Sequence, residues 1–212
     1  MKTRAEIKAL AKESFRLNYW PLVGIVALYT VINARLVYTG VGSAILTAPI
    51  MTGFFFVMIS CFSGMGCDVG AMFTKGFENF GRKLGGYWWM QLFLFLWFLI
   101  PIAGLVLVVI KSLSYAMTMY ILSDCPNVKA KDALALSKRM MKGHKWELFV
   151  FQLSFIGWHI LSLLTCGVLY IFWTAPFCQL SFAGYYLELR EDCLRRGVIT
   201  TDELDGAPLM NA

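Results

Sequence analysis

The chain has 212 residues, of which 58% are hydrophobic and only 15% charged, and its mean hydropathy is +0.64. A soluble domain carries about one-quarter charged residues, so this composition excludes an ordinary soluble domain and favours a membrane protein. The net charge of +6 does not predict nucleic-acid binding, because the basic residues adjoin apolar segments and no zinc-finger spacing occurs.

The basic residues gather in four short polar stretches. These stretches hold 17 of the 19 Lys and Arg residues and cover residues 1–18, 64–86, 124–146 and 190–212. Only Arg35 and Lys111 lie outside them. Lysines and arginines beside apolar spans are typical of the cytoplasmic side of a membrane, where anionic lipid is the simplest partner.

The N-terminal segment Lys2–Leu17 predicts an amphipathic helix that lies at the lipid interface, because apolar residues recur on one side at helical spacing. The aromatic pair Tyr19-Trp20 then marks the headgroup level. A first span is expected from Trp20 to Tyr38 and a second from Val41 to Phe62, with a kink at Pro49.

The apolar region between Tyr87 and Leu122 has two interpretations. It is either one long span or two shorter spans that reverse at Pro101–Gly104. The positive-inside rule favours the reversal, since a single span would place one of the basic stretches on the outer side. A short amphipathic segment within residues 64–86 and the aromatic collar Tyr87-Trp88-Trp89 precede this region.

The third basic stretch predicts a surface helix over Val128–Lys142, followed by Trp146 as a third collar. A fifth span is expected from Leu148 to Leu164 and a sixth from Val168 to Leu189, with a kink at Pro176.

The predicted fold is therefore an all-α, polytopic membrane protein with six transmembrane helices in three hairpins and with amphipathic interfacial helices. The membrane domain covers residues 1–190, and residues 191–212 form a partly disordered cytoplasmic tail. Both termini are expected in the cytoplasm. The order of amphipathic helix, collar and two spans recurs three times, either by internal repetition or because the membrane interface imposes the same pattern.

The six cysteines include no CxxC pair. Since Cys67, Cys125 and Cys193 fall in stretches assigned to the cytoplasm, we expect free thiols that pack as small hydrophobic groups. No metal site and no cofactor is predicted.

Three polar residues within the spans are candidates for a polar membrane interior: Lys111, Arg35 and His159. A charged or ionisable group at this depth faces a cavity or a partner, or else extends toward the interface. For His159 we weigh hydrogen bonds to Ser162, Gln179 or Ser181 on other helices against a role in proton transfer.

Charged residues near the inner interface form two further groups. The candidate anionic-lipid-facing residues are Lys131, Lys138, Arg139, Lys142 and Lys145. The carboxylates Asp124, Asp132, Glu147 and Glu188 would suit acid–base chemistry on a headgroup, but helix capping and pairing with nearby Lys and Arg residues is the favoured explanation. No catalytic motif occurs, so no catalytic residue is predicted.

Several segments resemble a family of bacterial integral membrane proteins known as domain-of-unknown-function family 975. They are MKTRAEIKALAK, MFTKGFENF, the run ALSKRMMKGHKWELFVFQLSFIGWHILSLLTCGVLYIFWTAPF, and GYYLEL. More distantly, the layout is similar to the membrane region of bacterial glycerophosphodiester phosphodiesterases, without their catalytic barrel. The resemblance implies a location in the bacterial cell membrane and supports six spans, but it assigns no site residue.

These observations favour a non-enzymatic accessory protein that binds lipid, in particular anionic lipid, or a protein partner, which includes a second copy of the chain. The first alternative is a small transporter or flippase-like conduit that uses Lys111, Arg35 and His159. The second alternative is a lipid-modifying enzyme that acts through Asp124, Glu147 and Glu188.

Overall fold

The computed structural model describes residues 2–37, 41–98, 104–165 and 167–206. It confirms the all-α class, since 82% of the chain is helical and no strand occurs in the described part. The elements are α1 (Arg4–Leu17), α2 (Tyr19–Val37), α3 (Val41–Phe62), α4 (Val69–Phe77), α5 (Phe80–Phe98), α6 (Gly104–Tyr115), α7 (Thr118–Asp124), α8 (Ala130–Met140), α9 (Lys145–Leu153), α10 (Ile156–Leu164), the π-helical turn η1 (Tyr170–Thr174), α11 (Ala175–Arg195) and α12 (Thr201–Leu204).

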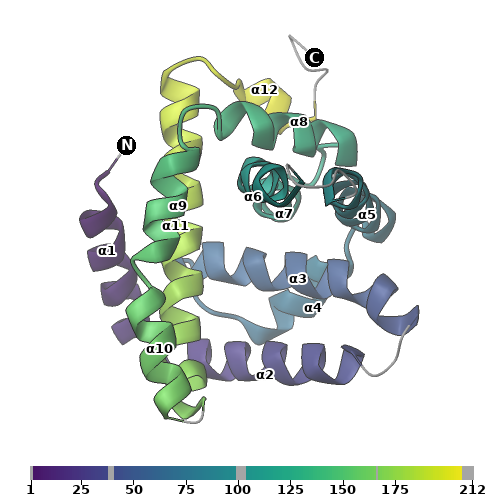
Figure 1. The fold of residues 1–212 in the computed structure, drawn as a ribbon. Coiled ribbons are helices and arrows are strands. Elements are labelled where there is room, and N and C mark those ends of the chain that lie inside the picture. Colours follow the sequence, from purple (N-terminus) through teal and green to yellow (C-terminus); the bar gives the residue numbers. More distant parts are fainter. Residues whose placement is uncertain (1, 38–40, 99–103, 166, 207–212) are drawn as a thin grey trace.

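Helices that are neighbours in sequence pack in pairs: α2 on α3, α5 on α6, and α10 on η1, which continues into α11. In Figure 1, α2 and α3 lie across the view, α5 and α6 are seen nearly end-on, and α9 to α11 run vertically. The apolar region 87–122 thus forms helices that lie side by side rather than one long helix. Residues 101–103 of the expected turn lie outside the described residues.

Helices α3, α7 and α11 meet at the centre of the molecule, with α7 following directly after α6. Their rings stack in sequence: Phe55 of α3 on Tyr120 of α7, with centroids 4.2 Å apart, and Tyr120 on Tyr186 of α11, 5.4 Å apart. The Ser123 hydroxyl on α7 donates to the Thr52 carbonyl of α3 over 2.8 Å. Aromatic pairs contribute about 0.5–1.5 kcal/mol each beyond the area they bury, so this stack is a substantial part of the core.

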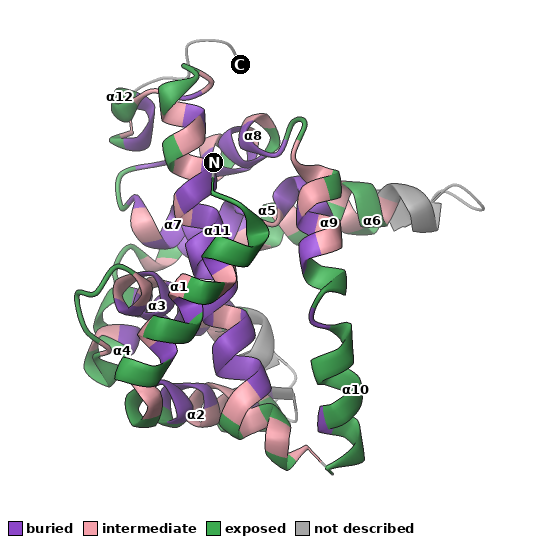
Figure 2. Cartoon of the chain, turned by 90° about the vertical axis from the view of Figure 1, so that its left-hand side faces the viewer, coloured by how far each residue is buried: buried purple, intermediate pink, exposed green. Residues whose placement is uncertain are grey.

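Three short amphipathic helices cover this centre from outside. Helix α4 packs on α3, α8 on α7, and α1 on α11. Helix α1 begins with a capping box between Thr3 and Glu6 and buries Ile7, Ala11 and Phe15. The expected apolar side, Ile7, Leu10, Ala11, Ser14 and Leu17, is confirmed at Ile7 and Ala11 but wrong at Leu17, which is 78% exposed. Figure 2 shows the buried residues concentrated on α3, α7 and α11, whereas α10 is exposed along almost its whole length.

The contact between α3 and α4 depends on two glycines. A Cβ at Gly53 would lie 1.8 Å from the Met72 carbonyl oxygen, and a Cβ at Gly76 would lie 2.6 Å from the Pro49 carbonyl oxygen. Glycine at both positions therefore lets the two backbones approach closely. Pro49 lies inside α3, as expected from the sequence.

The fifth predicted span consists of two consecutive helices, α9 and α10, with a short break between them. Helix α9 starts at Lys145, three residues before the predicted start, and ends at Leu153; α10 then continues from Ile156. At this point the Lys8 ammonium of α1 contacts the Ser154 hydroxyl at 2.5 Å and lies 4.1 Å from the centre of the Phe155 ring. The N-terminal helix is thereby attached to the middle of the span.

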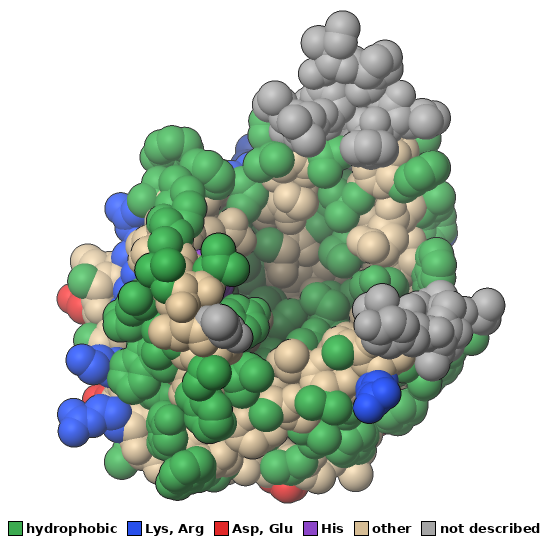
Figure 3. Space-filling view, turned by 60° about the horizontal axis from the view of Figure 1, so that its bottom comes forward, with side chains coloured by type: hydrophobic (Ala, Val, Ile, Leu, Met, Phe, Trp, Pro, Cys, Tyr) green, Lys and Arg blue, Asp and Glu red, His purple; other side chains and the backbone are tan. Residues whose placement is uncertain are grey.

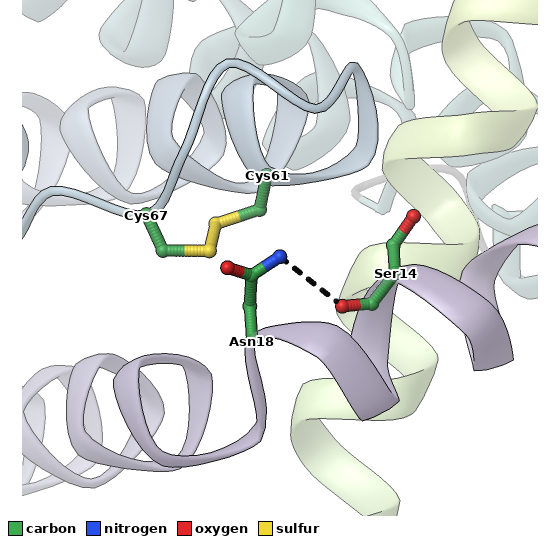
Figure 4. Close-up of a disulfide and its surroundings, with 4 residues drawn as sticks. All are labelled: Ser14, Asn18, Cys61 and Cys67. Atoms are coloured by element: carbon green, nitrogen blue, oxygen red, sulfur yellow. Dashed lines mark hydrogen bonds between the residues drawn. A yellow bond between two sulfur atoms is a disulfide. The ribbon is translucent and has the colours of Figure 1, made fainter.

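The expectation that the cysteines are free is wrong for Cys61 and Cys67, which form a disulfide (Figure 4). The bond joins the end of α3 to the loop before α4, close to Asn18, whose amide donates to the Ser14 carbonyl. Positive φ angles at Gly64 and Gly66 turn this loop back, so that the two cysteine Cα atoms lie 5.0 Å apart. This proximity comes from loop geometry, which the spacing alone does not reveal. Cys125, Cys178 and Cys193 are free and buried, and Cys166 is outside the described residues.

The segment after residue 190, for which the sequence predicts a partly disordered tail, is described as far as Gly206. Helix α11 extends to Arg195, and Ile199 and Glu203 are buried. The two carboxylate oxygens of Glu203 accept hydrogen bonds from Nη1 and Nη2 of Arg139 on α8, at 2.8 Å and 3.0 Å. This two-point ion pair holds α12 against α8. Residues 191–206 therefore pack on the membrane domain.

Three helical segments of the described chain are long and apolar enough to cross a membrane: Tyr19–Leu36, Ile45–Phe62 and Lys145–Leu164. This number is consistent with a membrane protein but does not support the predicted six spans in three hairpins. The other long helices are less apolar because α5 begins with Arg82 and Lys83 in its first turn, and α11 carries charged residues in its second half.

We expect Gly53→Ala to lower the thermal stability of the detergent-solubilised protein, because the added methyl group collides with the backbone of α4 at Met72. Overpacking costs about 1–3 kcal/mol, and at about 2–4 °C per kcal/mol for a chain of this size the midpoint should fall by about 3–10 °C. Gly24→Ala is the matched control, since Gly24 is also helical and a Cβ there meets nothing within 4 Å. Equal midpoints for the two variants would contradict the close α3–α4 contact.

Candidate functional site

Helix α8 carries the basic surface that the sequence singles out, and it is held firmly against the helices beneath it. Its buried side includes Leu136 and Met140, and the Ser137 hydroxyl donates to the Ser114 carbonyl of α6 over 2.8 Å. Gly86 of α5 allows a close approach, since a Cβ there would lie 2.4 Å from the Leu122 side chain. The opposite side of α8 remains free to carry exposed lysines.

A groove of about 320 Å³ runs between α5 and α8. Its lining combines two aromatic residues of α5 with two lysines and two apolar residues of α8: Trp89, Phe93, Lys131, Lys138, Leu134 and Ala135. Lys131 and Lys138 are two helical turns apart, which corresponds to about 10 Å along the axis of α8. The groove is therefore apolar along its length, with two cationic groups beside it.

Both lysines lie over aromatic rings. The Lys131 ammonium is 5.1 Å from the centre of the Trp89 ring, and that of Lys138 is 5.3 Å from the Tyr115 ring and 5.7 Å from the Phe93 ring. Such cation–π contacts hold a charged group at an apolar surface while leaving it exposed. Both lysines are exposed and Trp89 is about one-third exposed.

A second groove of about 310 Å³ lies between α6 and α9. Lys145 and Trp146 border it, and its floor comes from α6, including Ile110 and Leu113. Lys145 follows Lys138 by seven residues, as Lys138 follows Lys131. This spacing places the three lysines beside apolar surface of α5 and α6.

The other two basic candidates are placed differently. Lys142 is exposed and borders neither groove. Arg139 faces the other way, toward α12, where its guanidinium is one-quarter exposed and pairs with the buried Glu203. Among the five predicted residues, Arg139 thus has a structural ion pair instead of a free surface position.

The three polar candidates within the spans lie on separate helix pairs. Arg35 is exposed in the last turn of α2, Lys111 is half-buried on α6, and His159 is exposed on α10, with its ring 6.1 Å from that of Tyr170. Because the three pairs diverge, the fold places these residues on different limbs of the molecule (Figure 1).

The hydroxyl groups predicted as partners of His159 are engaged elsewhere. Ser162 bonds to Thr174 and to the Trp158 carbonyl, and Ser181 donates to the Phe177 carbonyl. Figure 3 shows a face that is hollowed at its centre, with mainly hydrophobic side chains around the hollow and the visible Lys and Arg side chains near the periphery.

The carboxylates near the inner interface have separate partners. Asp124 accepts from the Tyr186 hydroxyl at 2.9 Å and from Arg190. Glu147 contacts the His144 ring at 3.0 Å, and Glu188 pairs with Lys2 at 2.6 Å. Asp132 lies in the first turn of α8, where a carboxylate complements the helix dipole. These placements match capping and ion pairing, the simpler of the two interpretations.

Sequence reasoning missed a second polar cluster at the start of α5. Arg82 and Lys83 border a pocket of about 160 Å³ that also contacts α7 and the end of α4. Lys83 is only 4% exposed, although it lies in a stretch that the sequence marks as polar loop. The only available indication was the pairing of two basic residues one turn before the Tyr87 collar.

Residues 105–192 match the model of a family described as a protein of unknown function, DUF975. No curated protein and no solved structure matches the chain. The predicted likeness to the membrane region of glycerophosphodiester phosphodiesterases is not shown. The matched segment includes α8 and its lysines but not α5, which supplies the aromatic side of the groove. The match supports the resemblance to this family over residues 105–192, which is less than half of the chain.

Proposed function

We propose that this protein is a six-span protein of the bacterial cell membrane that binds anionic lipid headgroups through the groove between α5 and α8. The observation that carries the proposal is the pairing of two exposed lysines, Lys131 and Lys138, with the aromatic surface of Trp89 and Phe93. We assign it the role of a non-enzymatic accessory protein. In support, the carboxylates that could do acid–base chemistry, Asp124, Glu147 and Glu188, are each held in an ion pair or hydrogen bond.

The groove suits a phospholipid better than a soluble ligand. A headgroup phosphate is attracted by both ammonium groups, and an acyl chain removes the apolar lining of the groove from contact with water. Trp88 is half exposed and Trp89 one-third exposed, as expected of aromatic residues at the headgroup level. Each basic residue near an anionic leaflet contributes about 1 kcal/mol.

The six-span topology adds α5, α6 with α7, and η1 with α11 to the three apolar spans. In this topology each helix pair reverses direction, and we propose that all four basic stretches share the cytoplasmic side with both termini. The disulfide loop between α3 and α4 then faces the cytoplasm, a compartment in which disulfides are rare.

The orientation can be tested by thiol labelling in intact cells. A cysteine placed at Lys138 should resist a membrane-impermeant reagent and react only after permeabilisation, because α8 lies on the inner side. A cysteine introduced at Val168, in the turn between α10 and η1, is the matched control and should react from outside. Labelling of position 138 in intact cells would invert the topology and remove the lipid groove from the inner leaflet.

The double substitution Lys131→Gln, Lys138→Gln should weaken the binding of phosphatidylglycerol to the detergent-solubilised protein. The loss of two basic residues at about 1 kcal/mol each corresponds to about 30-fold in Kd, which a lipid titration by native mass spectrometry measures. Binding of phosphatidylcholine should change little, because its headgroup has no net charge.

The charge-matched control is Lys129→Gln, Lys142→Gln, because both residues are exposed and border neither groove. A several-fold smaller effect of this pair identifies the groove as the binding site. If both pairs weaken phosphatidylglycerol equally, the attraction comes from overall charge and the proposed site is wrong.

A further inference from the structure

The small polar pocket at the start of α5 carries an unbalanced positive charge. Five ionisable side chains border it: Lys75, Glu78, Arg82, Lys83 and Asp124. Glu78 is paired with Lys75 at 3.0 Å, and Asp124 is paired with Arg190. Each carboxylate is thus matched by its own cation, and the charges of Arg82 and Lys83 remain uncompensated.

Arg82 is held by neutral acceptors alone among the described residues. Its Nη1 donates to the carbonyls of Cys125 at 2.8 Å and Val128 at 2.6 Å, and its Nη2 donates to the Leu122 carbonyl at 2.8 Å. These bonds fix the guanidinium at the end of α7. The Nε–H is buried and has no partner in the described part of the chain. A buried donor without an acceptor is costly, so the rest of the packing around Arg82 must hold the guanidinium in place.

Lys83 is in a similar position. Its ammonium donates to the carbonyls of Lys75 and Gly76, the latter at 3.2 Å, and thereby caps the end of α4. Burial, and secondarily the neighbouring Arg82, lowers the pKa of Lys83 to about 8. Lys75 acts in the same direction and Glu78 opposes it, while Asp124 borders the pocket from α7.

The pocket volume limits what can bind. At about 160 Å³ it is smaller than the 300–1,000 Å³ typical of pockets for drug-sized ligands. A single tetrahedral oxyanion is of suitable size and charge, and the planar guanidinium with an adjacent ammonium is the usual donor set for phosphate oxygens.

We propose that the pocket between the α4–α5 turn and the end of α7 binds a phosphate-type oxyanion through Arg82 and Lys83. The site is separate from the α5–α8 groove and does not depend on it. A lipid headgroup and a free phosphate group both have the required chemistry. A headgroup is considered because Lys83 lies one helical turn before the Tyr87 collar, which is expected at the headgroup level.

Sulfate is the probe, because its charge stays constant between pH 6 and pH 9. Titration of the purified full-length protein by calorimetry, at constant ionic strength with chloride as the reference ion, should show saturable binding of sulfate. Arg82→Gln and Lys83→Gln should each weaken it by about tenfold or more, as expected for the loss of a charge-assisted hydrogen bond. The matched control is Lys75→Gln, Glu78→Gln, which removes an ion pair of the same pocket without changing its net charge and should leave binding within about twofold.

The wild-type protein gives a second test that needs no substitution. Lysine is charged below its pKa, so sulfate binding should be strongest below about pH 8 and weaken as the pH rises through that value. The proposal is overturned if sulfate binds no better than chloride, or if Lys83→Gln and Arg82→Gln both bind sulfate with the wild-type affinity.

Glycerol 1-phosphate and short-chain phosphatidylglycerol then distinguish the source of the anion. If the lipid is the ligand, the short-chain lipid should bind more tightly than the soluble phosphate and lose affinity in Arg82→Gln. Soluble phosphate that binds equally well identifies a free anion. The variant Lys131→Gln, Lys138→Gln should still bind sulfate normally, so failure of the α5–α8 groove and failure of this pocket give different results.

Discussion

The three diverging helix pairs are held together by contacts among α3, α7 and α11, the helices that meet at the centre. Stacked rings of Phe55, Tyr120 and Tyr186 connect them, and Asp124 bonds to Tyr186 and Arg190 at one end of the same contact. The exposed limbs make few contacts of this kind, and α10 buries only Ser162. The stability of the protein outside a membrane therefore depends mainly on this centre, whereas much of the apolar surface of α10 is exposed.

Amphipathic helices cover the centre from three sides, but their packing differs in detail. Helix α4 packs on α3 and α1 packs on α11, whereas α8 packs on both α5 and α7. Internal repetition and the pattern that a membrane interface imposes both stay possible explanations.

Local sequence patterns predicted the parts of this fold that depend on local physics. The boundaries of α3 agree with the expected Val41–Phe62 segment, and the apolar side expected of α1 is buried at Ile7 and Ala11. Contacts between distant segments were not predictable. The Arg139–Glu203 pair joins residues 64 positions apart and gives a predicted lipid-facing arginine a structural ion pair. The aromatic lining of the α5–α8 groove likewise comes from α5, far in sequence from the lysines of α8.

Helix α5 connects the two sites because it starts earlier than its apolar character implies. The collar at Tyr87 led us to expect a span from that point, yet the helix begins at Phe80, so its first turns stand outside the apolar region. These turns carry Arg82 and Lys83 into the pocket with α7, and the next turns carry Gly86 under α8 and Trp89 into the groove. Helix α5 thus contributes to both sites. It carries the buried cations Arg82 and Lys83 itself, and it lines the groove beside the exposed Lys131 and Lys138 of α8.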